Sequence, residues 1–184
     1  LEVYAGFHAK YKPSDGMVVT VATDPHAISP DFYDVPRKYS DKFFNMQKVY
    51  SKPGDIYLPY AYSKYDFFPA DVPTEPDLDA VLIGMPYEQR VQWINELKRH
   101  GVKAHMENGP VFDEARALYN RARIGLNWSS MEDLNCRAFE LPAMKLYPVL
   151  NYVPDLHEFN FSDYCGIFRD LPSAVDEVLW AMNH

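Results

Sequence analysis

The sequence contains little cysteine and no long apolar run. Its two cysteines, Cys136 and Cys165, are too few for a disulfide framework, and since neither has a CxxC partner we expect no metal site. No apolar stretch approaches the ~18 residues of a membrane span, so no transmembrane segment is predicted. No secretory signal is visible either, although the chain begins at Leu1 rather than at methionine. These absences favour a cytoplasmic setting by default.

Positive charge is also scarce. The chain carries 18 Lys and Arg against 26 Asp and Glu, which gives a net charge of −8 and a pI of about 5.2. Broad nucleic-acid binding needs a basic surface, so we expect no nucleic-acid partner, whereas a local basic site for a nucleotide diphosphate stays compatible with this balance. With 47% hydrophobic and 24% charged residues, the 184 residues have the composition of a soluble globular protein of one large or two small domains.

Aromatic side chains are concentrated in the first part of the chain. Residues 1–76 hold nine of the 14 tyrosines and six of the 11 phenylalanines, a density that either packs against something or binds something. Prolines at 69, 73 and 76 indicate a linker at the end of this region. We therefore assign 1–76 to a partial amino-terminal α/β segment and linker. The elements expected in it are a short helix at 29–37 and strands at 17–22, 41–44 and 56–59.

From residue 77 the pattern changes to alternating strands and helices. Short apolar runs alternate with segments whose apolar residues recur at helical spacing, as Val91, Ile94 and Leu97 do. Such alternation predicts an α/β domain over 77–184, with a Rossmann-like parallel sheet, flanking helices and right-handed crossovers. The expected strands are 80–84, 102–106, 123–126, 147–150 and 164–168, and the expected helices are 88–100, 111–121, one from about 134, and 172–182.

A polar loop between two of these strands holds the most informative residues. It follows the strand at 123–126, and open α/β sheets bind ligands at the carboxyl ends of their strands. Two glutamates, Glu132 and Glu140, stand there with seven residues between them, and Arg137 lies between the two. The start of the following helix could bind an anion through its unpaired N–H groups, or its polar residues could simply cap the helix. The residues in question are Ser129, Ser130, Asp133, Leu134 and Asn135.

This spacing resembles the E-x7-E motif of retaining GT-B glycosyltransferases. The wider run YNRA (119–122), IGLN (124–127) and RAFE (137–140) resembles the group 1 branch that includes spore-maturation-type glycosyltransferases, whose pattern is YNRAKIGLN followed by R-x-FE. The resemblance covers residues 78–184 well and the preceding segment more loosely. It implies that 77–184 is the carboxyl-terminal, donor-binding domain of a GT-B enzyme.

The resemblance also implies roles for individual residues. Glu140 would bind the ribose hydroxyls of a nucleotide-sugar donor, because a carboxylate accepts two hydroxyl bonds. Glu132 would contact the sugar. Gly84 and Arg90 would lie at the diphosphate, where a guanidinium stabilises the charge of the departing group. Gly109 belongs to a loop that would hold the base through its backbone. The structural alternatives are a helix-surface Glu140 paired with Arg137, a solvated loop acid at 132, an exposed Arg90, and an ordinary Asn-Gly turn.

The sequence departs from the family where a glycine is usual after the second glutamate. The turn reads LPAMKL (141–146), with Lys145 near the expected glycine. Glycine would allow close approach of the backbone to phosphate, so Lys145 either replaces that contact by charge or marks an altered donor site. Pro142 lacks an N–H and is expected to kink the helix.

In the first part of the chain, Asp24 and His26 follow a predicted strand. By the carboxyl-end rule they would face a cleft, and the segment loosely resembles the end of the amino-terminal domain of the same enzymes. The alternative is that Asp24 caps a turn and His26 is an ordinary surface residue.

The resemblance therefore implies a GT-B glycosyltransferase that needs no metal or cofactor beyond its nucleotide diphosphate sugar. The acceptor, whether glycan, protein or lipid, is undefined. With one whole domain and part of another, the chain is expected to be a fragment that lacks its amino-terminal domain, a subunit of an oligomer, or a compact variant. Two alternatives remain. One is a non-catalytic nucleotide- or sugar-binding module, suggested by Lys145 and Pro142. The other is an interaction domain that makes contacts through Tyr57, Tyr60, Tyr62 and Tyr65.

Overall fold

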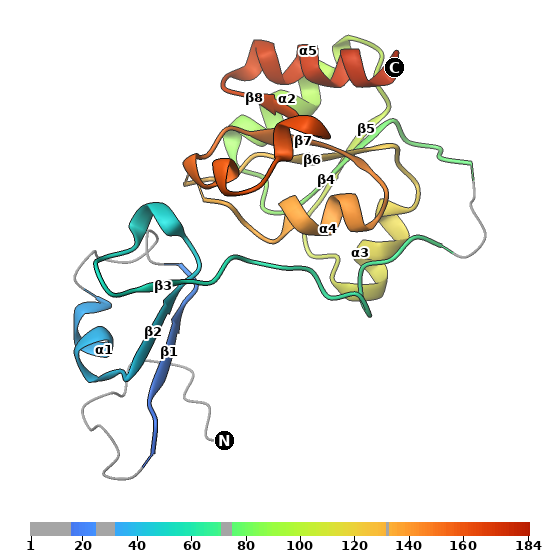
Figure 1. Ribbon diagram of the computed structural model, residues 1–184. Helices are drawn as coiled ribbons and strands as arrows, with labels where there is room; N and C mark the ends of the chain where they lie inside the picture. The colour runs from blue at the N-terminus through green and yellow to red at the C-terminus, as the bar shows by residue number, and fades with distance from the viewer. Residues whose placement is uncertain (1–15, 25–31, 71–74, 132) are drawn as a thin grey trace. The chain divides into compact units, whose positions relative to one another are not determined.

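A computed structural model of the chain describes residues 16–24, 32–70, 75–131 and 133–184 (Figure 1). The chain divides into two compact units, Leu1–Tyr60 and Ala61–His184. Residues 61–70, expected from composition to lead into a linker, belong to the second unit. Within it the Phe67 ring lies 6.4 Å from the Tyr119 ring, and the Ala70 N–H donates to the Asn120 side chain at 3.1 Å. The second unit therefore begins before the proline-rich stretch.

The first unit contains a small parallel sheet. Strands β1 (Val19–Ala22), β2 (Lys42–Asn45) and β3 (Ile56–Tyr57) lie in that order, and helix α1 (Asp34–Tyr39) connects the first two. A 3-10 turn follows β2 (η1, Lys48–Tyr50). The expected partial α/β unit is thus confirmed. Of the helix expected at 29–37, residues 29–31 lie outside the described residues, and the described helix begins at Asp34.

An ion pair joins the elements of this first unit. The Arg37 guanidinium donates to both carboxylate oxygens of Asp55, at 2.7 and 2.9 Å, and lies 4.3 Å from the centre of the Phe43 ring. Burial of Asp55 tends to raise the pKa of its carboxyl, but hydrogen bonds from Arg37, the Lys52 N–H and Asn45 outweigh it, so the pKa is lowered. Asp55 therefore stays ionised and holds α1 to the loop before β3.

The second unit is a five-stranded parallel sheet with helices on both faces, which confirms the Rossmann-like expectation. Figure 1 shows α2 and α5 on one side of the sheet and α3 and α4 on the other. The strand order is β5-β4-β6-β7-β8. The strands are β4 (Ala80–Ile83), β5 (Ala104–Glu107), β6 (Ile124–Asn127), β7 (Tyr147–Asn151) and β8 (Gly166–Phe168). The helices are α2 (Glu88–Arg99), α3 (Phe112–Tyr119), α4 (Arg137–Ala143) and α5 (Leu171–Met182).

Alternate residues of the strands pack into two separate hydrophobic cores, one on each face of the sheet. On β4, Val81 and Ile83 join the cluster beneath α3 and α4, whereas Ala80 and Leu82 join the cluster beneath α2 and α5. Both faces of the strand are therefore buried, which is why β4 reads as a continuous apolar run rather than an alternating one. Two 3-10 turns between β7 and β8, η2 (Pro154–Glu158) and η3 (Phe161–Asp163), were not expected from the sequence.

The helix expected from about residue 134 begins at Arg137 instead. The Asn135 side chain accepts a hydrogen bond from the Arg137 N–H at 3.2 Å and so forms a local turn ahead of α4. The helix continues through Pro142 to Ala143. By contrast, α5 begins where expected, because Asp170 and Ser173 form a capping box.

Lys145 occupies the position at the end of α4 where glycine is usual. Its φ of 60° is left-handed, its N–H bonds to the Pro142 carbonyl at 3.0 Å, and the Leu146 N–H bonds to the Leu141 carbonyl at 3.1 Å. These two bonds are the Schellman pattern, which favours glycine because a Cβ is strained there. The family's missing glycine therefore corresponds here to a helix-ending position.

Replacing Lys145 with glycine is expected to raise the free energy of unfolding of the second unit by about 0.5–1 kcal/mol. Relief of the left-handed strain stabilises the folded state by more than the greater freedom of glycine stabilises the unfolded chain. Urea unfolding followed by tryptophan fluorescence reports on this unit, since Trp93, Trp128 and Trp180 all lie within it. Lys145→Ala is the control, because it removes the charge and keeps the strain. Equal changes in both variants would contradict the backbone explanation.

In the part of the chain that the structure describes, no helix is long and apolar enough to cross a membrane.

Candidate functional site

The strand order changes direction at β4, and this switch point holds the candidate site. The chain goes from β4 to its neighbour β5 on one side, then returns to β6 on the other side of β4. In open α/β sheets the carboxyl ends of the strands beside such a point form the ligand crevice. Here those ends are Gly84 and Met85 after β4, and Trp128 and Ser129 after β6.

Arg90 bridges the two strand ends at the switch point. Its Nε donates to the Trp128 carbonyl at 2.7 Å, and its Nη1 donates to the Met85 carbonyl at 3.1 Å. The residue is only 5% exposed, and its guanidinium lies 5.0 Å from the centre of the Tyr87 ring. The first turn of α2 therefore places a fixed, buried positive charge between β4 and β6. Arg90 is not the exposed helix residue of the alternative interpretation.

Arg137 approaches the same point from the first turn of α4. A Cβ built on Gly84 would lie 2.8 Å from Arg90 Nη1, 3.5 Å from Arg137 Nη2 and 3.7 Å from Arg137 Cζ. Two guanidinium groups thus converge on the backbone of Gly84, whose φ of 153° is itself a conformation that favours glycine. Arg137 Nε is buried and has no hydrogen-bond partner. Buried polar groups are rarely left unpaired, so this N–H is an unusual feature of the Arg137 side chain.

The electrostatics of the pair favour an anion. Burial lowers the pKa of the Arg90 guanidinium, and the neighbouring charge of Arg137 lowers it further, while Tyr87 and Asp133 oppose this. Two like charges held together in a partly buried site are costly unless an opposite charge is supplied. A phosphate or diphosphate would supply it and would accept hydrogen bonds from guanidinium N–H groups.

The polar residues after β6 form the wall of the site rather than a set of free donors. The Ser129 N–H donates to the Asn151 side chain at 2.6 Å, and the Asn151 amide donates back to the Ser129 hydroxyl at 3.0 Å. Asn135 donates to buried Asn127 at 3.4 Å, and Leu134 is part of the core. Of the described loop residues expected at the donor site, only Ser130 is exposed. Asp133 is half-buried, and its charge acts on the Arg90 guanidinium.

Glu140 lies half-buried one turn along α4 from Arg137. Burial raises the pKa of its carboxyl, and hydrogen bonding from the Cys136 thiol and the charge of Arg137 oppose that effect only in part. Within the described part of the chain, no ion pair within 4.0 Å joins Glu140 to Arg137. Its nearest ionisable groups are Cys136, Arg137 and buried Tyr119, whose own pKa is raised by burial. Glu132, the first glutamate of the motif, lies outside the described residues.

Lys145 does not join this site. It precedes β7, so it lies at the amino ends of the strands, whereas Gly84, Arg90 and Arg137 meet at the carboxyl ends. Its role is the helix-ending position described above. The structure therefore does not support Lys145 as a second phosphate contact, and Arg137 is the second cation at Gly84.

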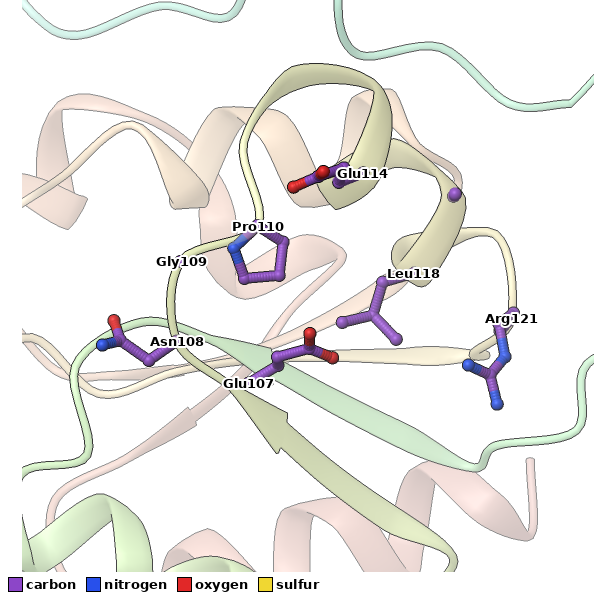
Figure 2. A pocket seen from close by; sticks show the side chains of 8 residues that line it. Glu107, Asn108, Gly109, Pro110, Glu114, Leu118 and Arg121 are labelled. Carbon is purple, nitrogen blue, oxygen red and sulfur yellow. The ribbon is translucent and has the colours of Figure 1, made fainter.

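The loop containing Gly109 borders a hollow of about 480 Å³ (Figure 2). The hollow lies between the end of edge strand β5 and helix α3. Figure 2 shows that its lining combines carboxylates, an amide, a guanidinium and apolar groups. The lining residues are Glu107, Asn108, Gly109, Pro110, Glu114, Ala117, Leu118 and Arg121. The Gly84 N–H donates to the Glu107 carbonyl at 2.9 Å, so this hollow adjoins the arginine pair.

Among the residues described, no group of three or more His, Cys, Asp or Glu side chains is placed to hold a metal ion. Both cysteines are free, and burial raises the pKa of each thiol to about 12, so neither is ionised near neutrality.

The candidate residues of the first unit are less defined. Asp24 is exposed, just beyond β1, where its carboxylate accepts from the Thr23 hydroxyl at 3.2 Å, and His26 lies outside the described residues. Of the four tyrosines proposed for an interaction surface, Tyr60 donates to the Thr23 carbonyl at 2.9 Å, whereas Tyr62 and Tyr65 are exposed.

Sequence reasoning missed Asn151 and Trp128 as parts of this site. Asn151 holds Ser129, and Trp128 supplies the carbonyl that fixes Arg90. Asn151 could have been found, because it is the polar residue that ends an apolar strand. The backbone role of Trp128 has no signature in a side-chain pattern.

Comparison with known proteins adds no identification. No protein-family model matches the chain, and no curated protein matches it.

Proposed function

We propose that the second unit binds a nucleotide diphosphate sugar and that the chain acts as a GT-B glycosyltransferase. The observation that carries the proposal is the convergence of Arg90 and Arg137 on the Gly84 backbone at the switch point of the sheet. A diphosphate fits this arrangement, since it carries several negative oxygens and accepts hydrogen bonds from guanidinium and backbone N–H groups. The proposed reaction proceeds with retention and without a metal.

In the proposed reaction the bond between the sugar's anomeric carbon and the diphosphate oxygen breaks, the acceptor hydroxyl oxygen bonds to that carbon, and the hydroxyl proton passes to the departing diphosphate. Negative charge then develops on the leaving diphosphate. Arg90 is already held by two backbone carbonyls, so it can stabilise this charge without reorganising. Arg137 contributes the second charge. Glu140 is proposed to bind the ribose and Glu132 the sugar.

A non-catalytic binding module is the second candidate, and the surroundings of Glu140 favour it. Burial raises the pKa of this carboxyl, and its neighbour Cys136 is a hydrogen-bond donor. A glutamate that is held within the protein accepts ribose hydroxyls less readily than a free one. Such a protein would bind the nucleotide through its arginines and leave the sugar unreacted.

Thermal unfolding of the full chain with nucleotides tests the proposal. We expect GDP or UDP to stabilise the protein, by about 2.7 kcal/mol at a concentration of 100 times Kd. The matching nucleosides, which lack the diphosphate, are the control and should have little effect. Hydrolysis of UDP- and GDP-sugars then separates the two candidates, because the module would bind without releasing sugar. If no nucleoside diphosphate or nucleotide sugar stabilises the chain, both candidates are wrong.

A further inference from the structure

The hollow beside the arginine pair is rich in hydrogen-bond acceptors. Glu107 and Glu114 contribute carboxylates, and Asn108 contributes an amide. The one cation in its lining, Arg121, is already engaged, because its Nε and Nη2 donate to the two carboxylate oxygens of Asp77 at 2.9 and 2.7 Å. A ligand group bound here is therefore favoured if it presents donors rather than acceptors.

Apolar and polar groups both line the hollow. Leu118 and Pro110 provide apolar surface, and the polar side chains lie around it (Figure 2). Purine and pyrimidine rings bind in this way, with their faces on apolar groups and their edges on a few polar groups. The volume of about 480 Å³ is ample for one base.

The strand end that borders the hollow is hydrogen-bonded to the candidate diphosphate site. Glu107 pairs with Ile83 across β5 and β4, and its carbonyl accepts the Gly84 N–H. Gly84 is the residue on which the two guanidinium groups converge. A nucleotide with its phosphates at Gly84 would therefore have its base near the end of β5.

The family resemblance implies that the Gly109 loop holds the base of the donor, and we propose that Glu107, in the hollow beside this loop, makes the site selective for guanine. The inference rests on the proposed function, since it concerns the base of the same nucleotide. Guanine presents two adjacent donors, N1–H and the 2-amino group, which match the two oxygens of a carboxylate. Uracil presents one donor flanked by two carbonyl oxygens, which a carboxylate repels. Glu107 Oε2 lies 3.0 Å from His105 Nε2, which leaves Oε1 and a further lone pair of Oε2 for the base.

Calorimetric titration of the full chain with GDP, IDP and UDP tests this inference. IDP is the matched ligand control, because hypoxanthine differs from guanine only by lacking the 2-amino group. We expect GDP to bind about tenfold or more tightly than either IDP or UDP, as expected for one charge-assisted hydrogen bond. Glu107→Gln should remove most of this preference by weakening GDP, while UDP binding changes by less than about threefold.

Glu114→Gln is the matched variant control, since it removes the other carboxylate of the hollow. It should keep the preference for GDP. Equal or tighter binding of UDP by the wild type would overturn the inference and leave the proposed function standing. A preference that survives Glu107→Gln, or is lost in Glu114→Gln alone, would overturn the role of Glu107. Absence of binding by every nucleotide would instead refute the proposed function, and the wild-type comparison requires no variant to fold.

Discussion

Replacing Arg137 with methionine is expected to weaken the binding of nucleoside diphosphates by about 10- to 100-fold, the effect of losing one or two charge-assisted hydrogen bonds. The same change should leave the free energy of unfolding within about 1 kcal/mol of wild type, since the loss of an unpaired buried N–H offsets the loss of the contact with Tyr119. Methionine keeps the length of the side chain. Calorimetry and urea unfolding of the same preparation measure both quantities.

Arg90→Met is the matched comparison. Arg90 donates to the Met85 and Trp128 carbonyls, so its loss removes two charge-assisted hydrogen bonds, although the Met85 carbonyl still accepts from the Tyr87 N–H at 2.9 Å. We expect this variant to lose binding and also about 2–4 kcal/mol of stability. Binding that survives in Arg137→Met would show that the second guanidinium is not part of the anion site. A large loss of stability in that variant would show that its role is structural.

The second large effect concerns the packing of α4 on the sheet. A Cβ at Gly125 on β6 would meet Leu141 Cδ2 closely and would lie 3.0 Å from its Cγ. Leu141 is fully buried, so it has little room to move. We expect Gly125→Ala to lower the free energy of unfolding by about 1–3 kcal/mol through overpacking. Leu141→Ala should lower it by about 2–5 kcal/mol by opening a cavity.

The double variant tests whether the two residues act on each other. With Leu141 shortened, the new methyl at 125 fills part of the space, so the combined loss should be smaller than the sum by about 1–3 kcal/mol. Leu82→Ala is the control partner, because Leu82 lies in the core on the opposite face of the sheet. Its effect should add to that of Gly125→Ala within about 0.5 kcal/mol. Additivity with Leu141→Ala as well would contradict the close contact.

Much of the fold follows from local pattern, and the misses have local causes. The five strands of the second unit were predictable because buried parallel strands are short apolar runs between helical segments. The start of α4 was not predictable from the sequence. The same polar residues could have capped a helix that began one turn earlier, and a single hydrogen bond, from the Arg137 N–H to the Asn135 side chain, forms the turn instead. The 3-10 turns after β7 lack any apolar period to mark them.

The position of the site was predictable from the sequence, but the contacts between its side chains were not. The carboxyl-end rule and the family resemblance pointed to Gly84, Arg90 and the loop after β6, which the structure brings to one edge. That Arg137 meets Arg90 depends on how α4 crosses the sheet, and that Lys145 falls at the other edge depends on the length of α4. Neither follows from residue spacing, because both are set by packing between elements far apart in the sequence.

The short arm formed by residues 61–70 has a practical consequence. Arg116 lies 4.2 Å from the centre of the Phe68 ring, and Phe67 covers part of Tyr119, which is only 2% exposed. A fragment that began at residue 77, where the composition changes, would lack these rings. Apolar surface of α3 would then be exposed, which favours aggregation. A fragment of the second unit made for crystallisation should therefore begin at or before Ala61.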